Sequence, residues 1–159
     1  MARFLALSLT HIACLIVGFG LGIYMLPILT APDSPSSEQG ESAADTSRYT
    51  GDFRRSLEGS DALHWGEGRV FVGDQSISLM GRIAPGPDYR LYLAPRFVET
   101  ESDFLALKPR ALEVGPVKTF ENFIVPVPDS VDVSAFNTVV IWCESFSEFI
   151  TAAEYRRKR

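Results

Sequence analysis

The segment from Phe4 to Leu29 constrains the fold of this chain most, because it contains no Asp, Glu, Lys or Arg. As an α-helix it would reach ~39 Å, which exceeds the ~30 Å hydrocarbon core of a bilayer. A cleaved signal peptide is the alternative, but its apolar region is normally only about 7 to 15 residues long and ends in small residues. We therefore expect residues 1–30 to form an uncleaved transmembrane anchor whose partner is the lipid bilayer.

Arg3 and the free amino terminus precede this apolar run, and the positive-inside tendency then keeps the N-terminus in the cytoplasm. The rest of the chain would lie on the other side, which in a Gram-negative bacterium is the periplasm. We therefore expect a single-pass protein of the bacterial inner membrane. Gly18 and Gly22 have the small-xxx-small spacing that lets two helices approach closely, so a homodimer through this face is a hypothesis.

The remainder of the chain divides by composition. Residues 31–48 contain no aromatic or large aliphatic side chain and cannot offset their ordering entropy, so we expect a disordered linker. Residues 49–155 are long and apolar enough for one β domain, and residues 156–159 form a basic tail. Because that tail holds four of the cations, the rest of the chain is more acidic than the net charge of -5 suggests. An acidic body argues against nucleic acid as a partner.

Strand signals dominate the predicted domain. The stretches 69–72 and 76–83 flank Gly73-Asp74-Gln75 and predict a hairpin. The turn signal at residues 85–88 precedes a predicted strand with Tyr89, Leu91 and Leu93 on one face. A further apolar stretch, 120–125, is ended by Pro126.

The clearest strand is 138–143, which is apolar on both faces and should therefore be central and covered. Val139, Ile141 and Cys143 share one face, and Val140 and Trp142 share the other. Only 104–112 and 147–155 resemble short helices. The pattern predicts an all-β domain, a β-sandwich or a barrel-like fold of short antiparallel strands, preceded by one transmembrane helix.

Cys143 is the candidate redox residue. The only other cysteine, Cys14, lies in the apolar run, so Cys143 has no partner within its own domain. A lone thiol in an oxidising compartment points to intermolecular pairing or redox work, and the alternative is a buried small hydrophobic residue at a strand end. A reactive thiolate requires a nearby cation or helix N-terminus. Glu144 would oppose it, whereas a short helix opening at 145–148 would favour it.

His64 and Trp142 are candidate binding residues, His64 because it precedes the glycines of a turn-like segment. A hydrogen bond from His64 to its own turn is the alternative. We predict no cofactor, because the sequence offers neither zinc-ligand spacing nor a Cys-x-x-Cys-His haem attachment motif. Haem ligation by His64 with a methionine such as Met80 stays open in principle. Without a catalytic motif, a turnover enzyme is the least favoured class.

An ordered set of short motifs resembles the DM-thirteen domain, which is found associated with DOMON domains. The resemblance spans residues 49–155 and implies a β-rich extracytoplasmic domain with an electron-transfer role centred on Cys143. Two departures stand out: Ile150-Thr151 follow Phe149 where we expect a glycine, and the stretch 118–122 lacks the usual Gly and Tyr. The motifs are Gly51-Asp52-Phe53, His64 with Gly66-x-Gly68, Gly86-Pro87-Asp88-Tyr89-x-Leu91-Tyr92-Leu93, Phe123-x-Val125-Pro126, and Val139-Val140-Ile141-Trp142-Cys143 with Phe146 and Phe149.

Two functions therefore remain open at this point. The first is a membrane-tethered redox or electron-transfer module that acts through Cys143 with an unknown redox partner. The alternative is a binding module that presents a surface or apolar pocket to a protein, glycan or small ligand.

Overall fold

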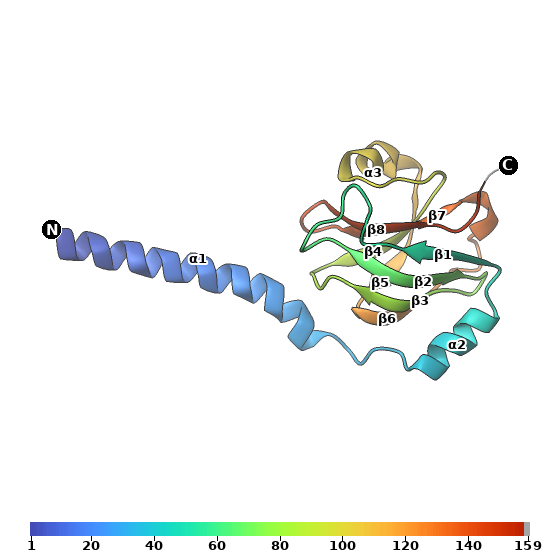
Figure 1. Ribbon diagram of the computed structural model, residues 1–159, viewed down its shortest axis with the longest axis horizontal. Helices are drawn as coiled ribbons and strands as arrows, with labels where there is room; N and C mark the ends of the chain where they lie inside the picture. Colours follow the sequence, from blue (N-terminus) through green and yellow to red (C-terminus); the bar gives the residue numbers. More distant parts are fainter. Residues whose placement is uncertain (158–159) are drawn as a thin grey trace.

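The apolar run forms one continuous helix, α1 (Ala2–Thr30), which projects from the folded domain (Figure 1). The computed structural model describes residues 1–157. No residue of α1 is buried, and the helix is long and apolar enough to cross a membrane. A helix of this kind near the N-terminus fits both a signal anchor and a signal peptide.

A second helix, α2 (Ser37–Asp45), lies within the segment expected to be a disordered linker. Ser36 and Gln39 form a capping box, in which the Ser36 hydroxyl accepts from the Gln39 amide and the Gln39 side chain accepts from the Ser36 amide. Gly40 is buried against Met80 of the domain. Capping and contacts with β2, β3 and β6 thus order a segment that has almost no apolar surface of its own.

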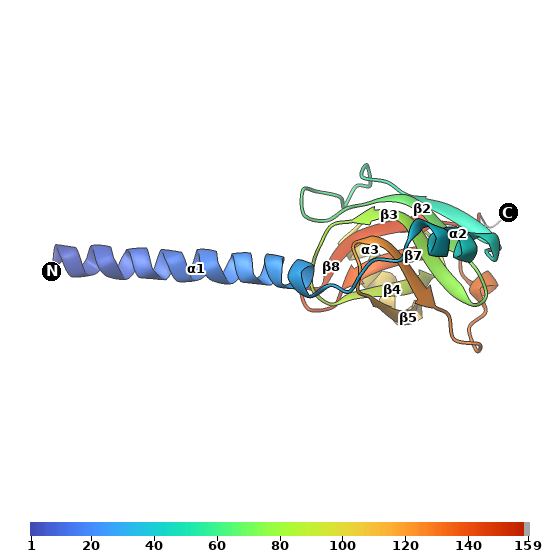
Figure 2. The same cartoon turned by 90° about the horizontal axis from the view of Figure 1, so that it is seen from below.

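The domain is a sandwich of two four-stranded antiparallel sheets, which Figure 2 shows from below. The first sheet has the order β1-β2-β3-β6 and the second has the order β5-β4-β7-β8. The sheets also approach each other along β1 and β8 and along β5 and β6, which makes the sandwich barrel-like. The strands are β1 (Tyr49–Phe53), β2 (Gly66–Val72), β3 (Ser76–Ile83), β4 (Tyr89–Ala94), β5 (Leu112–Val117), β6 (Glu121–Pro126), β7 (Thr138–Cys143) and β8 (Glu148–Glu154).

The predicted central strand is confirmed as β7, which lies between β4 and β8 and is buried along its whole length. Val139, Ile141 and Cys143 belong to the core between the sheets. Val140 and Trp142 belong to a second apolar cluster on the outer face of the same sheet. The predicted hairpin is also confirmed, as β2 and β3 paired with Val72 opposite Ile77.

The helix α3 (Glu101–Leu107) covers that outer face and explains why β7 is apolar on both sides (Figure 1). Its Phe104 ring lies 5.0 Å from the Trp142 ring and 5.3 Å from the Tyr92 ring. Two single 3₁₀ turns follow, η1 (Lys108–Arg110) and η2 (Val133–Ala135).

The predicted sandwich of short antiparallel strands after a long N-terminal helix is confirmed. The all-β prediction is wrong for the chain as a whole, because α2 and α3 accompany the two sheets in addition to the expected helix α1. The stretch 147–155 was expected to be helical but forms β8, whose Ala153 and Thr151 pair with Val139 and Ile141 of β7. Pairing with a buried central strand outweighs a weak local helix preference. No short helix opens at 145–148 either, because β7 and β8 are joined by a tight turn that ends at Ser147 with φ 54°.

The last strand, β8, ends at the side of the domain away from α1 (Figure 1). Within the expected basic tail, Arg156 donates to the carbonyl of Ser134, and Arg157 lies 3.5 Å from a carboxylate oxygen of Glu154. Residues 158–159 of that tail lie outside the described part of the chain.

Candidate functional site

The candidate site is built around Cys143, the last residue of β7. Its side chain faces the core between the sheets, and the residue is only 2% exposed. The thiol donates a hydrogen bond to the carbonyl oxygen of Pro87, 3.1 Å away. Cys143 and Cys14 are both free thiols, and Cys14 is exposed on α1.

Burial is the main reason that the pKa of the Cys143 thiol lies above its usual value of 9.0. The backbone amides of Phe146 and Ser145 act in the opposite direction, because they lie near the sulfur and favour a thiolate. The carboxylates of Asp88 and Glu148 raise the pKa further. The resting thiol is therefore protonated at neutral pH, but two amide donors already lie where a negative sulfur would need them.

Glu144, which was expected from the sequence to oppose a thiolate, is bound by Lys108 and Tyr92. One carboxylate oxygen accepts from Lys108 Nζ at 2.7 Å and the other accepts from the Tyr92 hydroxyl. Burial tends to raise the pKa of Glu144, but these two donors outweigh it and the pKa is lowered. The negative charge of Glu144 is thus paired with Lys108, which also lies 5.3 Å from the Trp142 ring.

A cavity of about 310 Å³ adjoins the thiol and brings Cys143 and His64 into one site. His64 comes from the loop between β1 and β2, whereas Cys143 ends a strand of the other sheet, so the two residues meet only in the folded domain. The wall is mainly apolar. The lining residues are Gly20, Ile23 and Tyr24 of α1 and Leu63, His64, Pro85, Gly86, Pro87, Tyr89, Cys143, Phe146, Glu148 and Ile150 of the domain.

His64 is fixed by its own turn. Its Nδ1 lies 3.0 Å from Asp61 Oδ2, and Asp61 Oδ1 accepts from the backbone amides of Leu63 and His64, each at 2.7 Å. The hydrogen bond with His64 is the largest cause that lowers the pKa of Asp61. With Nδ1 engaged in this way, Nε2 is the imidazole nitrogen left for other partners.

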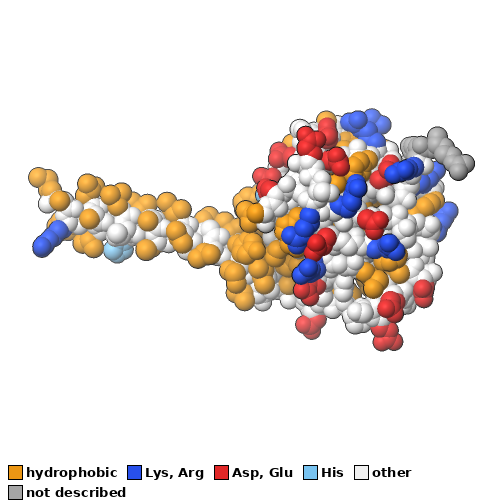
Figure 3. Space-filling view, in the orientation of Figure 1, with side chains coloured by type: hydrophobic (Ala, Val, Ile, Leu, Met, Phe, Trp, Pro, Cys, Tyr) orange, Lys and Arg blue, Asp and Glu red, His pale blue; other side chains and the backbone are white. Residues whose placement is uncertain are grey.

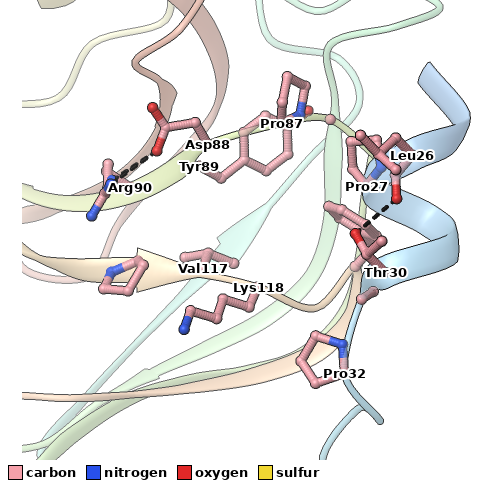
Figure 4. A pocket seen from close by; sticks show the side chains of 14 residues that line it. Leu26, Pro27, Thr30, Pro32, Pro87, Asp88, Tyr89, Arg90, Val117 and Lys118 are labelled. Atoms are coloured by element: carbon pink, nitrogen blue, oxygen red, sulfur yellow. Dashed lines mark hydrogen bonds and ion pairs between the residues drawn. The ribbon is translucent and has the colours of Figure 1, made fainter. Parts of the chain in front are cut away.

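Tyr89 is a site residue that the sequence analysis did not single out. It lies opposite Cys143 in the β4–β7 register, and burial, followed by the charge of a Cys143 thiolate, raises its pKa. Tyr89, with Gly86 and Pro87, also lines a second cavity of about 400 Å³, between the end of α1 and the domain. Figure 4 shows Leu26, Pro27 and Thr30 of α1 facing Pro87 and Tyr89 across it.

The structure does not bring the other candidate residues to the Cys143 cavity. Trp142 is fully buried beneath α3, and its Nε1 has no hydrogen-bond partner within residues 1–157. Met80, the possible haem ligand, lies against Gly40 of α2. Among the described residues, no group of three or more His, Cys, Asp and Glu side chains is arranged to hold a metal ion.

Most of this site lies in the part of the chain that matches a protein family. The family model described as "Electron transfer DM13" matches residues 56–155, which include His64, Tyr89 and Cys143. The chain belongs to the DM13 family. The family prediction made from the sequence is therefore confirmed, and the DM13 match covers every strand of the sandwich except β1. No curated protein and no solved structure is significantly similar to this DM13 chain.

Proposed function

We propose that this DM13 protein is a membrane-tethered electron-transfer module in which Cys143 is the redox-active group. The observation that carries the proposal is the position of the thiol, which borders a cavity shared with His64 and lies near two backbone amides that favour a thiolate. A cysteine that served only as core packing would need neither feature. The electron-transfer assignment of the DM13 family supports the same reading.

The redox step proposed for a single thiol is exchange with a disulfide carried by a partner protein. Cys143 loses its proton, and its sulfur attacks one sulfur of that disulfide. A mixed disulfide forms, and the partner's other sulfur leaves with the bonding electron pair and takes up a proton. The Cys143 sulfur is oxidised, and the departing sulfur is reduced.

The residues around the thiol have complementary roles in this proposal. The amides of Ser145 and Phe146 stabilise the negative sulfur as the proton leaves. His64, held at Nδ1 by Asp61, offers Nε2 as a proton acceptor on the cavity wall. Loss of the proton also breaks the bond to the Pro87 carbonyl, which frees the sulfur to move toward the cavity.

We further propose that α1 is an uncleaved anchor with the N-terminus in the cytoplasm and residues 49–155 on the other side. The sequence argument for an anchor is the charge-free length of the helix. The contact of its C-terminal part with the domain adds to this argument, since Gly20, Ile23 and Tyr24 help to form the wall of the Cys143 cavity. A cleaved signal peptide would leave that wall incomplete.

An aromatic disulfide, dithiodipyridine, tests the redox proposal directly. The full chain in detergent, with Cys14 replaced by Ser, should release one equivalent of thiopyridone, and adding Cys143→Ser should abolish the release. His64→Gln, which keeps a polar side chain but removes the base, should slow the reaction several-fold. If the folded chain is inert while the urea-unfolded chain reacts fully, the thiol is structural. A visible absorption spectrum of the same sample tests for haem.

The alternative function is a binding module without redox chemistry. The burial of Cys143 and the raised pKa of its thiol favour this alternative. It predicts that Cys143→Ser preserves function, because a serine hydroxyl can donate to the Pro87 carbonyl in place of the thiol. Loss of electron transfer in a folded Cys143→Ser protein excludes it.

A further inference from the structure

The end of the domain that carries the Cys143 cavity is also the end at which α1 enters. Three cavities lie between the C-terminal part of α1, or the chain just after it, and loops of the domain. In Figure 3, hydrophobic side chains continue without a break from α1 onto the adjoining end of the domain. The apolar surface of the helix and that of the domain therefore form one continuous surface.

The depth of this surface follows from the length of the helix. A hydrocarbon core of ~30 Å takes about 20 helical residues, so a span that begins at Phe4 ends near Ile23. Ile23 and its neighbours Gly20 and Tyr24 line the same cavity as Leu63 and Phe146. These two domain residues therefore lie level with the membrane boundary, and a span placed nearer the C-terminus of α1 would put them deeper.

The two loops that reach this level carry exposed apolar side chains. Leu63 is 58% exposed and Phe146 is 52% exposed, and among the described residues of the domain only one other large apolar side chain, Leu105, is exposed rather than buried or half-buried. Tyr24, on the helix beside them, has the amphipathic ring that is enriched at membrane interfaces. Exposed apolar residues gathered at the point where a membrane helix enters mark a membrane-contacting surface.

From these observations we propose that the domain itself docks on the bilayer, with Leu63 and Phe146 inserted in the interface and the Cys143 cavity opening at the lipid surface. The inference rests on the proposed anchor role of α1. Its occupant is the lipid bilayer, because the surface is continuous with the membrane-spanning helix. A redox partner of Cys143 would then reach the thiol along the membrane.

The charges around the surface indicate which lipids it requires. Glu148 lines the Cys143 cavity, and Asp61 bonds His64 on its wall. Asp88, Arg90 and Lys118 line the neighbouring 400 Å³ cavity. Neither sign of charge therefore dominates this surface. Docking is therefore driven by apolar insertion. It should occur equally on pure phosphatidylcholine and on bilayers that contain phosphatidylglycerol.

Spin labels on the full chain in phosphatidylcholine nanodiscs test the docked arrangement. Leu63→Cys and Phe146→Cys are labelled one at a time in a chain with Cys14→Ser and Cys143→Ser, and Leu105→Cys is the matched control. Leu105 is also an exposed apolar residue, 43% exposed, but it lies on α3. For each label, the collision rate with oxygen is divided by the collision rate with a water-soluble nickel complex. We expect this oxygen-to-nickel ratio to be several-fold higher at 63 and 146 than at 105.

Equal oxygen-to-nickel ratios at all three positions would overturn the inference. Shielding at 63 and 146 from both reagents, with dipolar broadening between labels, would show that a second copy covers the surface and would also overturn it. An intact mass that lacks α1 would overturn the inference as well, because the inference rests on the anchor role of that helix. If the cysteine-free chain does not fold, diazirine-labelled phosphatidylcholine applied to the wild-type chain should crosslink the peptides containing Leu63 and Phe146 and spare that containing Leu105. The dithiodipyridine reaction of Cys143 is independent of all these results, so failure of docking and failure of the redox proposal are distinguishable.

Discussion

Replacing Gly86 with Ala places a methyl group against the ring of Tyr89, which lines two of the cavities beside α1. An ideal Cβ at Gly86 would lie 2.7 Å from Tyr89 Cζ and 2.9 Å from Cε1, and closest of all to the phenol oxygen. Optimal carbon–carbon contacts are about 3.5–4.0 Å. Tyr89 is only 3% exposed and its ring meets Phe120 edge-on at 6.1 Å, so moving the ring disturbs this packing.

The expected cost of Gly86→Ala is about 2 kcal/mol of unfolding free energy, within the ~1–3 kcal/mol typical of overpacked cores. At an m-value of about 2 kcal/mol/M, the urea midpoint should fall by about 1 M. The measurement is urea unfolding of the full chain in detergent, followed by the fluorescence of the buried Trp142. The displaced Tyr89 ring should also change the rate at which Cys143 reacts, because the two residues face each other across β4 and β7.

Two variants show whether the Tyr89 ring is the cause. Gly115→Ala is the matched control, since its Cβ would meet only Val125 Cγ1 at 3.3 Å, and it should change stability by less than about 1 kcal/mol. Adding Tyr89→Phe to Gly86→Ala removes the nearest oxygen. The double variant should then be about 1 kcal/mol more stable than the sum of the two single changes predicts. Equal costs for the two glycine variants, or strict additivity in the double variant, would refute the steric explanation.

Four further predictions concern charge and capping. Burial raises the pKa of Cys143, so its reaction with an uncharged methanethiosulfonate should still accelerate above pH 9.0, and a plateau below pH 9.0 would contradict this. The pKa of this thiol is higher in the folded chain than in the unfolded one. The neutral buried thiol therefore stabilises the fold below pH 9.0, and this stabilisation is lost as the pH rises further. In Cys143→Ser the free energy of unfolding should no longer show this decrease at alkaline pH. Ser36→Ala should cost α2 about 1 kcal/mol, measured as faster amide exchange in that helix alone. Lys108→Met should lower the free energy of unfolding, measured with urea, by about 1–3 kcal/mol at pH 7, because the partly buried charge of Glu144 loses its partner. The cost should be smaller at pH 4. Adding Glu144→Gln should recover the lost stability.

The core of the sandwich could be predicted from local sequence because its strands alternate or are apolar throughout. Period-two alternation assigned Val139, Ile141 and Cys143 to one face of β7 and Trp142 to the other, as the structure has them. What the pattern does not specify is the element that covers each face. Trp142 was a candidate binding residue, but α3 buries it instead.

The candidate site was only partly accessible to sequence reasoning, for a reason of topology. Cys143 and His64 lie in segments of different sheets, and their shared cavity depends on how the two sheets and α1 pack together. The amides of Ser145 and Phe146 reach the sulfur from a turn rather than from the expected helix. A tight turn between paired strands can present successive amides to one atom without any helical periodicity in the sequence.

The two departures from the DM13 pattern are each accommodated by a neighbouring part of the fold. Thr151, where a glycine was expected, packs against Gly66 of β2, and a Cβ at Gly66 would lie 2.6 Å from Thr151 Cγ2. The space for the larger residue is therefore supplied by a glycine on the neighbouring sheet. In the stretch without its usual glycine, Asn122 adopts φ 48°, a conformation that asparagine tolerates better than most residues, and its side chain accepts from the Gly81 amide at 3.0 Å. The first departure is thus accommodated by a glycine that faces the larger side chain, and the second by the backbone conformation and hydrogen bond of Asn122.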